Sequence, residues 1–468
     1  MKRNWLKSIA LALTLAVAGG ALAGCGGVAA QQTGAAETPS AQAAGAPTAR
    51  AVGTDGQDSG AQTPAQAREL TFWYAGGKTA VNVLSEIVDG FNASQDSWHI
   101  TAVTQADYTE TFQKLQAGIA GGSAPDIALL GVMHATYLAG KGLLEDLEPM
   151  MSSDAAFDRG DYMEAFFNAG ALPDGTVFAL PAYGTTQVLY YNIAAFERAG
   201  IDPESIKTWQ DLEAAARAMT VRENGETVFY GWEPMWGYAN MIDAALCNGA
   251  RVFSDDGKTV LINSPEWVEV WETFGRWLHE DEIMTIHYGG QGWEYWYKTI
   301  DDVLQDKAGG YTGSSGDQAD LDFSLVAAME QPGWGENPSA PSADALQLTV
   351  PKRQDPDAAR GAYEFMKYFT SPENQAKWSM ATGYIAVRRS TSDVAEFKAY
   401  AAENPQALVP MSQAMHSTVL PLDPTGGAVY DALNIAGDKV EIEGISAREA
   451  LDEAQKTAQA ALDAALNG

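Results

Sequence analysis

The chain has 468 residues, 61 of them Asp or Glu and 29 Lys or Arg, which gives a formal net charge of -32 at pH 7. A surface this acidic repels phosphate backbones and anionic lipid headgroups, so the composition argues against nucleic-acid binding and against charge-driven membrane contact. After the first 25 residues, no apolar run approaches the ~20 residues that a spanning helix needs. We therefore expect a soluble body with no second membrane segment.

Residues 1–24 have the pattern of a bacterial export signal. A basic tip that includes Lys2 and Arg3 precedes an apolar run over residues 9–17, and Leu22-Ala23-Gly24-Cys25 matches the lipobox. We predict cleavage before Cys25, a diacylglyceryl group on its thiol, and anchoring at the extracellular face of the bacterial cell membrane. A plain secretory signal with a chance cysteine is the alternative.

The segment that follows, residues 25–68, is predicted to be a disordered tether behind the lipidated cysteine. Its residues 26–68 contain no Leu, Ile or aromatic side chain, so they cannot bury enough apolar surface to become ordered. Once Cys25 is acylated, Cys247 has no partner, which excludes a disulfide. We expect Cys247 to be a small buried apolar residue.

Strand and helix patterns alternate from residue 69 onward. The predicted strands cover 69–74, 100–103 and 126–130, and the predicted helices between them cover 81–91 and 112–119. This alternation favours an α/β fold with a mainly parallel sheet and helices on both faces. Further helices are predicted to begin after Thr208, Ser264 and Ser371, and an Ala-rich helix is predicted over 447–466.

Signatures of catalysis are scarce. None of the five His residues is paired at a metal-ligand spacing, and the sequence has neither a Gly-x-Ser-x-Gly motif nor a phosphate-binding glycine loop. We therefore expect a binding protein without catalytic residues, metal or cofactor. Two other classes stay open: a secreted glycan-cleaving enzyme, which needs two carboxylates facing each other across a cleft, and an adhesion or scaffold lipoprotein.

Aromatic residues are abundant, with 13 Trp and 18 Tyr, and they are densest over 232–238 and 292–297. Flat aromatic faces stack on sugar rings, while amides and hydroxyls bind the sugar OH groups. The structural alternative is that these side chains fill a core. That alternative explains Trp236 poorly, because Met235, Gly237 and Tyr238 surround it.

Residues 183–192, 199–203 and 207–212, which include Leu-Tyr-Tyr-Asn, Ala-Gly-Ile-Asp-Pro and Thr-Trp-Gln-Asp-Leu, resemble the extracellular solute-binding proteins of carbohydrate ABC importers (family 1). The likeness extends over nearly all of 69–468 and is greatest to the glycerol-3-phosphate and multiple-sugar binders. It implies a two-lobed periplasmic-binding-protein fold of type II, like maltose-binding protein, in which hinge segments join lobes that close on a ligand. The implied lobes are 69–187 plus 344–385 and 188–343 plus 386–468.

The resemblance also implies a monomer that delivers a small carbohydrate to ABC permease subunits and touches the membrane through its lipid alone. The ligand contacts that it implies come from aromatic, hydroxyl and basic side chains. They are Trp73, Tyr74, Tyr108, Thr185, Thr186, Trp232, Trp236, Tyr311, Ser314, Ser315, Tyr384 and Arg388.

Two departures from the family pattern bear on the ligand. Thr425–Ala428 occupies the place where glycerol-phosphate binders have an arginine, and Gly131–Met133 replaces an acidic residue that they carry. A buried phosphate without a cationic partner is heavily penalised. The sequence therefore favours a neutral sugar or oligosaccharide over glycerol 3-phosphate or a glycerophosphodiester, unless Arg388 or Arg389 supplies the missing charge.

Overall fold

The computed structural model describes residues 67–468 except 173, 238, 291–292, 354 and 468. The predicted signal, the predicted lipid on Cys25 and the predicted tether up to residue 66 lie outside the described residues. The predicted end of the tether at residue 68 is wrong, because Arg68 is already the first residue of a strand. Within the described part, no helix combines the length and the apolar character needed to cross a membrane.

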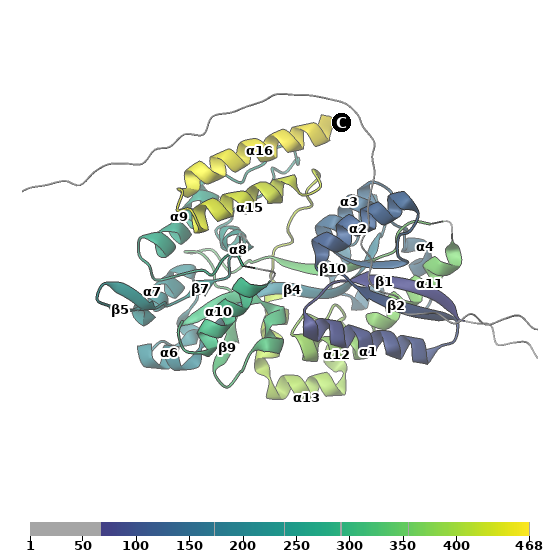
Figure 1. The fold of residues 1–468 in the computed structure, drawn as a ribbon, viewed down its shortest axis with the longest axis horizontal. Helices are drawn as coiled ribbons and strands as arrows, with labels where there is room; N and C mark the ends of the chain where they lie inside the picture. Colours follow the sequence, from purple (N-terminus) through teal and green to yellow (C-terminus); the bar gives the residue numbers. More distant parts are fainter. Residues whose placement is uncertain (1–66, 173, 238, 291–292, 354, 468) are drawn as a thin grey trace, which may run out of the picture. The chain divides into compact units, whose positions relative to one another are not determined.

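One large sheet organises the fold, in the strand order β2-β1-β3-β10-β4-β8-β7, with β9 also paired to β4 (Figure 1). A separate pair is formed by β5 (Val221–Glu223) and β6 (Glu226–Phe229). The strands of the large sheet are β1 (Arg68–Tyr74), β2 (Trp98–Thr104), β3 (Ile127–Gly131), β4 (Ala179–Asn192), β7 (Glu233–Pro234), β8 (Gly310–Ser314), β9 (Val326–Met329) and β10 (Ala343–Thr349).

The prediction of a mainly parallel sheet is wrong for the large sheet taken as a whole. Strands β1, β2 and β3 are parallel, as the strand–helix alternation indicates, and β7 is parallel to β8. Strands β4 and β10 are instead antiparallel to all the strands they pair with. The reason is that β10 returns from a distant part of the chain and inserts between β3 and β4, which local sequence patterns do not reveal.

Helices cover the sheet, and the predicted helix signals are confirmed at their starts. Thr208 forms a full capping box with Asp211, and Ser371 accepts the Asn374 N–H at 3.4 Å. The helices are α1 (Lys78–Ser94), α2 (Tyr108–Gly121), α3 (Val132–Gly140), α4 (Glu148–Ser153), α5 (Glu164–Asn168), α6 (Ile193–Ala199), α7 (Trp209–Met219), α8 (Ala239–Cys247), α9 (Pro265–His279), α10 (Glu294–Leu304), α11 (Pro356–Phe369), α12 (Pro372–Thr382), α13 (Ala395–Glu403), α14 (Val409–Ala414), α15 (Ala428–Glu441) and α16 (Ala447–Asn467).

The chain has two large apolar cores, and the paired strands β4 and β10 run between them. One gathers β1, α1 and α11 around residues such as Phe72 and Phe365. The other gathers α7, α9, α15 and α16 around residues such as Trp271. Figure 1 shows the α15–α16 pair beside α9, away from β1 and β2. Strand β4 contributes Tyr183 to the first core and Leu189 to the second, so this single strand joins them.

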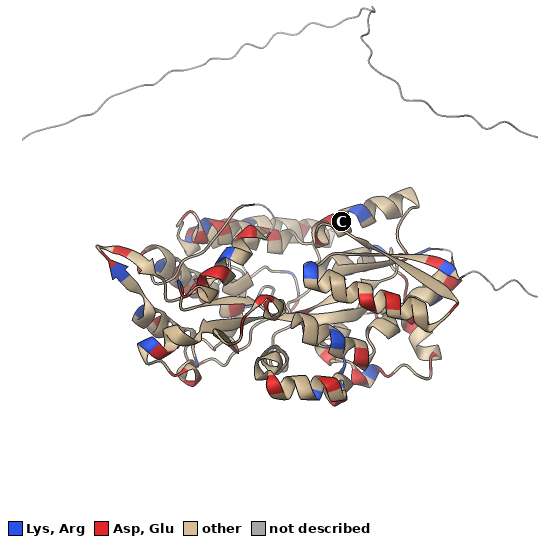
Figure 2. Cartoon of the chain, turned by 60° about the horizontal axis from the view of Figure 1, so that its bottom comes forward, with Lys and Arg blue, Asp and Glu red and all other residues tan. Residues whose placement is uncertain are grey.

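Cys247 lies in the second core with 1% of its surface exposed, as predicted. Burial raises the pKa of its thiol to about 12, which leaves it protonated and inert at neutral pH. The charged residues, in contrast, lie mainly on the outer helices and loops, where Asp and Glu predominate (Figure 2).

Candidate functional site

A cavity of about 440 Å³, here called the aromatic cavity, lies where the middle of β4 and the ends of β1 and β8 meet the start of α10. Its walls combine rings, hydroxyls and carboxylates, the mixture that suits a polar ligand with flat apolar faces. The lining residues include Lys78, Asp107, Tyr108, Thr185, Trp293, Trp296, Tyr297, Ser314, Gly316, Asp317, Asp320, Leu346 and Tyr384.

Stacked rings support one side of the aromatic cavity. The Tyr183 ring lies 4.7 Å from both the Tyr384 and the Trp378 ring centroids, and the Tyr183 hydroxyl is 3.0 Å from that of Tyr108. Rings packed this closely hold each other's orientation. Tyr108 and Tyr384 therefore present fixed faces and edges to the cavity.

Gly316 is required by the position of Tyr384. A Cβ built on Gly316 would lie 2.5 Å from the Tyr384 ring, closer than any real contact of that kind. The glycine of the Ser314-Ser315-Gly316 turn thus lets the backbone approach the ring closely. This close approach holds the hydroxyl-bearing turn against the tyrosine.

Helix α10 provides the opposite aromatic wall, and Asp317 fixes it. The Trp296 indole Nε1 donates to Asp317 Oδ1 at 2.8 Å, and the Tyr311 hydroxyl donates to Asp317 Oδ2 at 3.2 Å. Burial raises the pKa of Asp317 to about 8, against the opposing effect of these two hydrogen bonds. Trp293 and Tyr297, about half exposed, extend the wall toward solvent.

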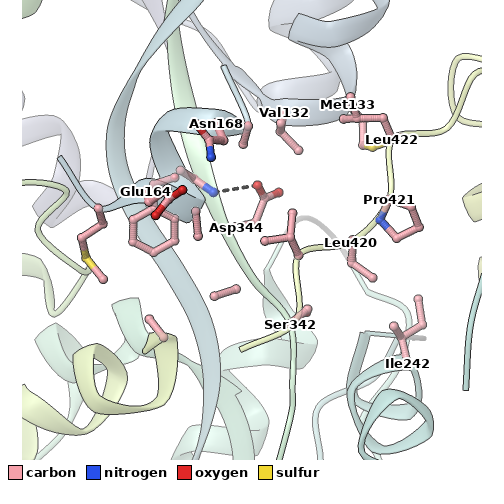
Figure 3. A pocket seen from close by; sticks show the side chains of 18 of the residues that line it. Val132, Met133, Glu164, Asn168, Ile242, Ser342, Asp344, Leu420, Pro421 and Leu422 are labelled. Carbon is pink, nitrogen blue, oxygen red and sulfur yellow. Dashed lines mark hydrogen bonds between the residues drawn. The ribbon is translucent and has the colours of Figure 1, made fainter. Parts of the chain in front are cut away.

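A second cavity of about 800 Å³, here called the apolar cavity, lies between α3, α5 and β10 on one side and α8 with residues 419–422 on the other (Figure 3). Val132, Met133, Ile242 and Leu420 make it largely apolar. In Figure 3 the Asp344 carboxylate points in among these groups. Burial raises the pKa of Asp344 to about 6, opposed by the Ala345 N–H at 2.6 Å from Oδ1.

The two cavities adjoin at the β4–β10 ladder. Thr185, which lines the aromatic cavity, is the register partner of Asp344, which lines the apolar cavity. Paired residues of adjacent strands project to the same face of a sheet. Thr185 and Asp344 therefore stand side by side at the boundary between the two cavities.

Of the residues predicted for the ligand site, four line the aromatic cavity: Tyr108, Thr185, Ser314 and Tyr384. They come from positions far apart in the sequence, so the fold brings them together. The resemblance to the family is what selected them.

Several predicted residues are instead buried in contacts with the protein itself. The Trp232 indole is fully buried and donates to Thr312 Oγ1 at 3.1 Å, and Tyr311 is engaged by Asp317. The Thr186 hydroxyl donates to the Ser342 carbonyl at 2.7 Å. Ser315, also fully buried, is not among the lining residues of either cavity.

The remaining predicted residues lie at the edges of the site or away from it. Trp73 is partly buried on β1, and the neighbouring Tyr74 hydroxyl accepts from Thr104 at 2.9 Å. The Trp236 indole donates to Asp438 Oδ1 at 2.9 Å and meets the Tyr295 ring edge-on.

Arg388 does not reach either cavity. It pairs with Asp161, and its guanidinium lies 4.6 Å from the centre of the Tyr162 ring. It is thus already occupied by a carboxylate and a ring. Its neighbour Arg389, in contrast, lines the apolar cavity.

Sequence reasoning missed the contribution of α10 and of two acidic residues. Residues 292–297 stand out by their aromatic density, but nothing in the sequence connects Trp293 and Trp296 to Tyr384. Asp317 and Asp344 are single carboxylates among 61 acidic residues. Only the fold distinguishes them, by burying them at cavity walls.

The sequence matches the family described as bacterial extracellular solute-binding protein over residues 86–406. The chain is similar to the sn-glycerol-3-phosphate-binding periplasmic protein UgpB of Yersinia pestis bv. Antiqua (strain Antiqua), with 27% identity over 424 residues that cover 84% of this chain and 90% of the relative.

Two solved structures share the fold. UgpB from Mycobacterium tuberculosis, in complex with glycerophosphocholine, gives a TM-score of 0.74 at 19% identity and covers 86% of this chain and 100% of its own. The ABC substrate-binding protein Lmo0181 from Listeria monocytogenes, in complex with cycloalternan, gives a TM-score of 0.73 at 21% identity. The match covers 84% of this chain and 98% of that protein. These matches confirm the predicted two-lobed α/β fold, and the chain belongs to the bacterial extracellular solute-binding proteins, the components that capture a small molecule for an ABC importer.

Proposed function

We propose that this chain captures a neutral sugar or oligosaccharide in the aromatic cavity and delivers it to a membrane permease. The observation that carries the proposal is the chemistry of the cavity wall. Tyr108, Tyr384 and Trp296 offer ring faces and edges, and Thr185 and Ser314 offer hydroxyls. Sugar rings present apolar C–H faces and many OH groups, which match these two kinds of contact.

The charges in the aromatic cavity support a ligand without a negative charge. Its lining includes Asp107, Asp317 and Asp320, and the one cation in that lining is Lys78, which is exposed. A phosphate there would face the carboxylates of Asp107 and Asp320, and also that of Asp317 above about pH 8, with the exposed Lys78 ammonium to oppose them and no guanidinium in the lining. Arg389 lies in the lining of the other cavity.

The cleft, in this proposal, includes both cavities, because Thr185 and Asp344 stand at their boundary. Hinge closure of lobes 69–187 plus 344–385 and 188–343 plus 386–468 would enclose the ligand. We further propose that the protein is a monomer held at the extracellular face of the cell membrane through a lipid on Cys25, since Leu22-Ala23-Gly24-Cys25 matches the lipobox.

The proposal is tested by calorimetric titration of the full-length chain in detergent with mono- and oligosaccharides, glycerol 3-phosphate and glycerophosphocholine. We expect micromolar or tighter binding to one neutral glycan. Binding to glycerol 3-phosphate alone would contradict the proposal. Incubation with the same glycans followed by product analysis separates binding from cleavage.

A second candidate ligand is a glycerophosphodiester that carries a quaternary ammonium group. The observation in its favour is the combination of Trp296, Tyr384 and Asp317 in one cavity, since aromatic faces and a carboxylate attract such cations. Arg389 could then meet the phosphate from the apolar cavity. This candidate predicts that Arg389→Ala abolishes glycerophosphocholine binding, whereas a neutral glycan would bind that variant unchanged.

A further inference from the structure

Three potential metal-binding side chains meet away from both cavities, at the far end of α10. They are Glu233 on β7, His287 in the segment before α10, and Asp302 near the end of α10. One donor atom from each lies within 4.8 Å of the others. We propose that these residues bind one divalent transition-metal ion, with Zn²⁺ as the best match.

The distances between the donor atoms suit a single small cation. His287 Nε2 lies 2.8 Å from Asp302 Oδ2 and 3.9 Å from Glu233 Oε2. Ligands bound at about 2.0–2.2 Å in a tetrahedron are separated by roughly 3.3–3.6 Å. The observed separations bracket that range, so small side-chain adjustments bring all three atoms into a coordination shell.

Glu233 points independently to a ligand. Its side chain is 3% exposed, and its Oε2 atom has no hydrogen-bond partner among the described residues. Buried carboxylate oxygens are normally paired, so an unpaired one facing a histidine and a second carboxylate calls for a positively charged partner. Two carboxylates and a neutral imidazole around a divalent ion leave no net charge to bury.

The surroundings hold the three donors in place. The backbone of Glu233 is held by pairing with Tyr311 on β8. The Thr285 N–H donates to the carbonyl of Trp232 at 3.3 Å, which ties the His287 segment to the residue that precedes β7. Lys307 Nζ lies 3.4 Å from Asp302 Oδ1, so the other carboxylate oxygen, Oδ2, is the one that faces His287.

The donor set selects the class of metal. An imidazole with two carboxylates suits Zn²⁺ and the neighbouring transition metals, whereas Ca²⁺ and Mg²⁺ prefer oxygen-only sites. With three protein ligands, the fourth position would hold water. The ion would fasten the end of α10 to β7, and the same helix places Trp296 and Tyr297 in the aromatic cavity.

The test uses the full-length chain without a histidine tag, stripped with chelator and titrated with Zn²⁺. We expect one ion per chain at micromolar affinity or better and a rise in melting temperature. Co²⁺ in place of Zn²⁺ is expected to give the intense visible absorption of a four-coordinate site. Absence of specific Zn²⁺ binding, or a preference for Ca²⁺, would overturn the proposal.

Three substitutions locate the ion. His287→Ala and Asp302→Asn, at partly exposed positions, are expected to weaken Zn²⁺ binding more than about 100-fold, and Glu233→Gln is expected to do the same if it folds. The matched control is His416→Ala, because His416 Nε2 also lies near a carboxylate, 3.3 Å from Glu330 Oε2, but has no third ligand in the part of the chain that the structure describes. Equal Zn²⁺ affinity in His287→Ala and His416→Ala would also refute the proposed metal site.

Discussion

The two cavities share a border but differ in what they can hold. The aromatic cavity has stacked rings and three carboxylates, and its walls are braced by hydrogen bonds such as that between Trp296 and Asp317. The apolar cavity is larger and is lined mostly by aliphatic side chains and Met, with Glu164, Asp344 and Arg389 as its charged residues. Ring faces and directed hydrogen bonds give orientation and selectivity, whereas an aliphatic surface contributes area alone. Under the proposed function, the aromatic cavity is therefore the one expected to orient and select the ligand.

The largest expected effect contrasts one residue from each cavity. Tyr384→Ala removes a ring braced by Tyr183, so we expect the affinity for the ligand to fall more than about tenfold, or ~1.4 kcal/mol. Leu420→Ala in the apolar cavity serves as the matched truncation and is expected to change affinity by less than about threefold. Titration calorimetry measures both. The reverse order would move the ligand to the apolar cavity.

The next effect separates the Trp296 ring from its hydrogen bond. Trp296→Phe keeps an aromatic face but loses the indole donor to Asp317, so the wall is less well fixed. We expect a loss of affinity of about fivefold with little change in melting temperature. Trp293→Phe is the control, because Trp293 is 51% exposed at the rim. Equal losses in the two variants would show that the Asp317 contact does not matter for binding.

The carboxylates of the two cavities predict different pH windows. Burial raises the pKa of Asp317 to about 8 and that of Asp344 to about 6, above the value of about 3.9 for an unfolded aspartate. Between the unfolded and folded pKa values the folded chain keeps a proton that the unfolded chain has lost. The free energy of unfolding therefore falls as pH rises through this window.

Chemical denaturation at a series of pH values checks this prediction. Relative to the wild type, Asp317→Asn is expected to lose less unfolding free energy as the pH rises to about 8. For Asp344→Asn the same difference is expected only up to about pH 6. Burial also raises the pKa of Glu441 to about 8, so the difference from the wild type is the quantity to compare. The same dependence of unfolding free energy on pH in both variants would contradict the different pKa values given to Asp317 and Asp344.

The smallest expected effect probes the border between the cavities. Thr185→Val removes one hydroxyl and keeps the shape, so we expect a loss of about 1 kcal/mol in binding free energy, or roughly fivefold. Thr186→Val is the internal comparison, because that hydroxyl bonds Ser342 and should affect stability more than affinity. Tighter binding by Thr185→Val would exclude a hydroxyl contact with the ligand.

Much of the fold could be predicted from local patterns, and part of the site from resemblance. The strand at residue 69, the Thr208 cap and the C-terminal helix follow from periodicity and capping chemistry, which act over a few residues. The antiparallel insertion of β10 depends on pairing across more than 150 residues, from Thr185 to Asp344, and no local signal carries it. For the same reason Tyr108 and Tyr384 could be named from family motifs, while the α10 wall could not.

Strand β4 has a consequence for the exchange of amide hydrogens with solvent. Its 14 residues run from one core, which includes Tyr183, to the other, which includes Leu189, so freeing its central amides is expected to require both halves of the protein to open together. These amides are expected to exchange last, at the rate of global unfolding, whereas the exposed β5–β6 pair exchanges early. The strand that joins the two lobes is therefore expected to make them unfold as one cooperative unit, so that the motion that admits a ligand leaves this strand intact.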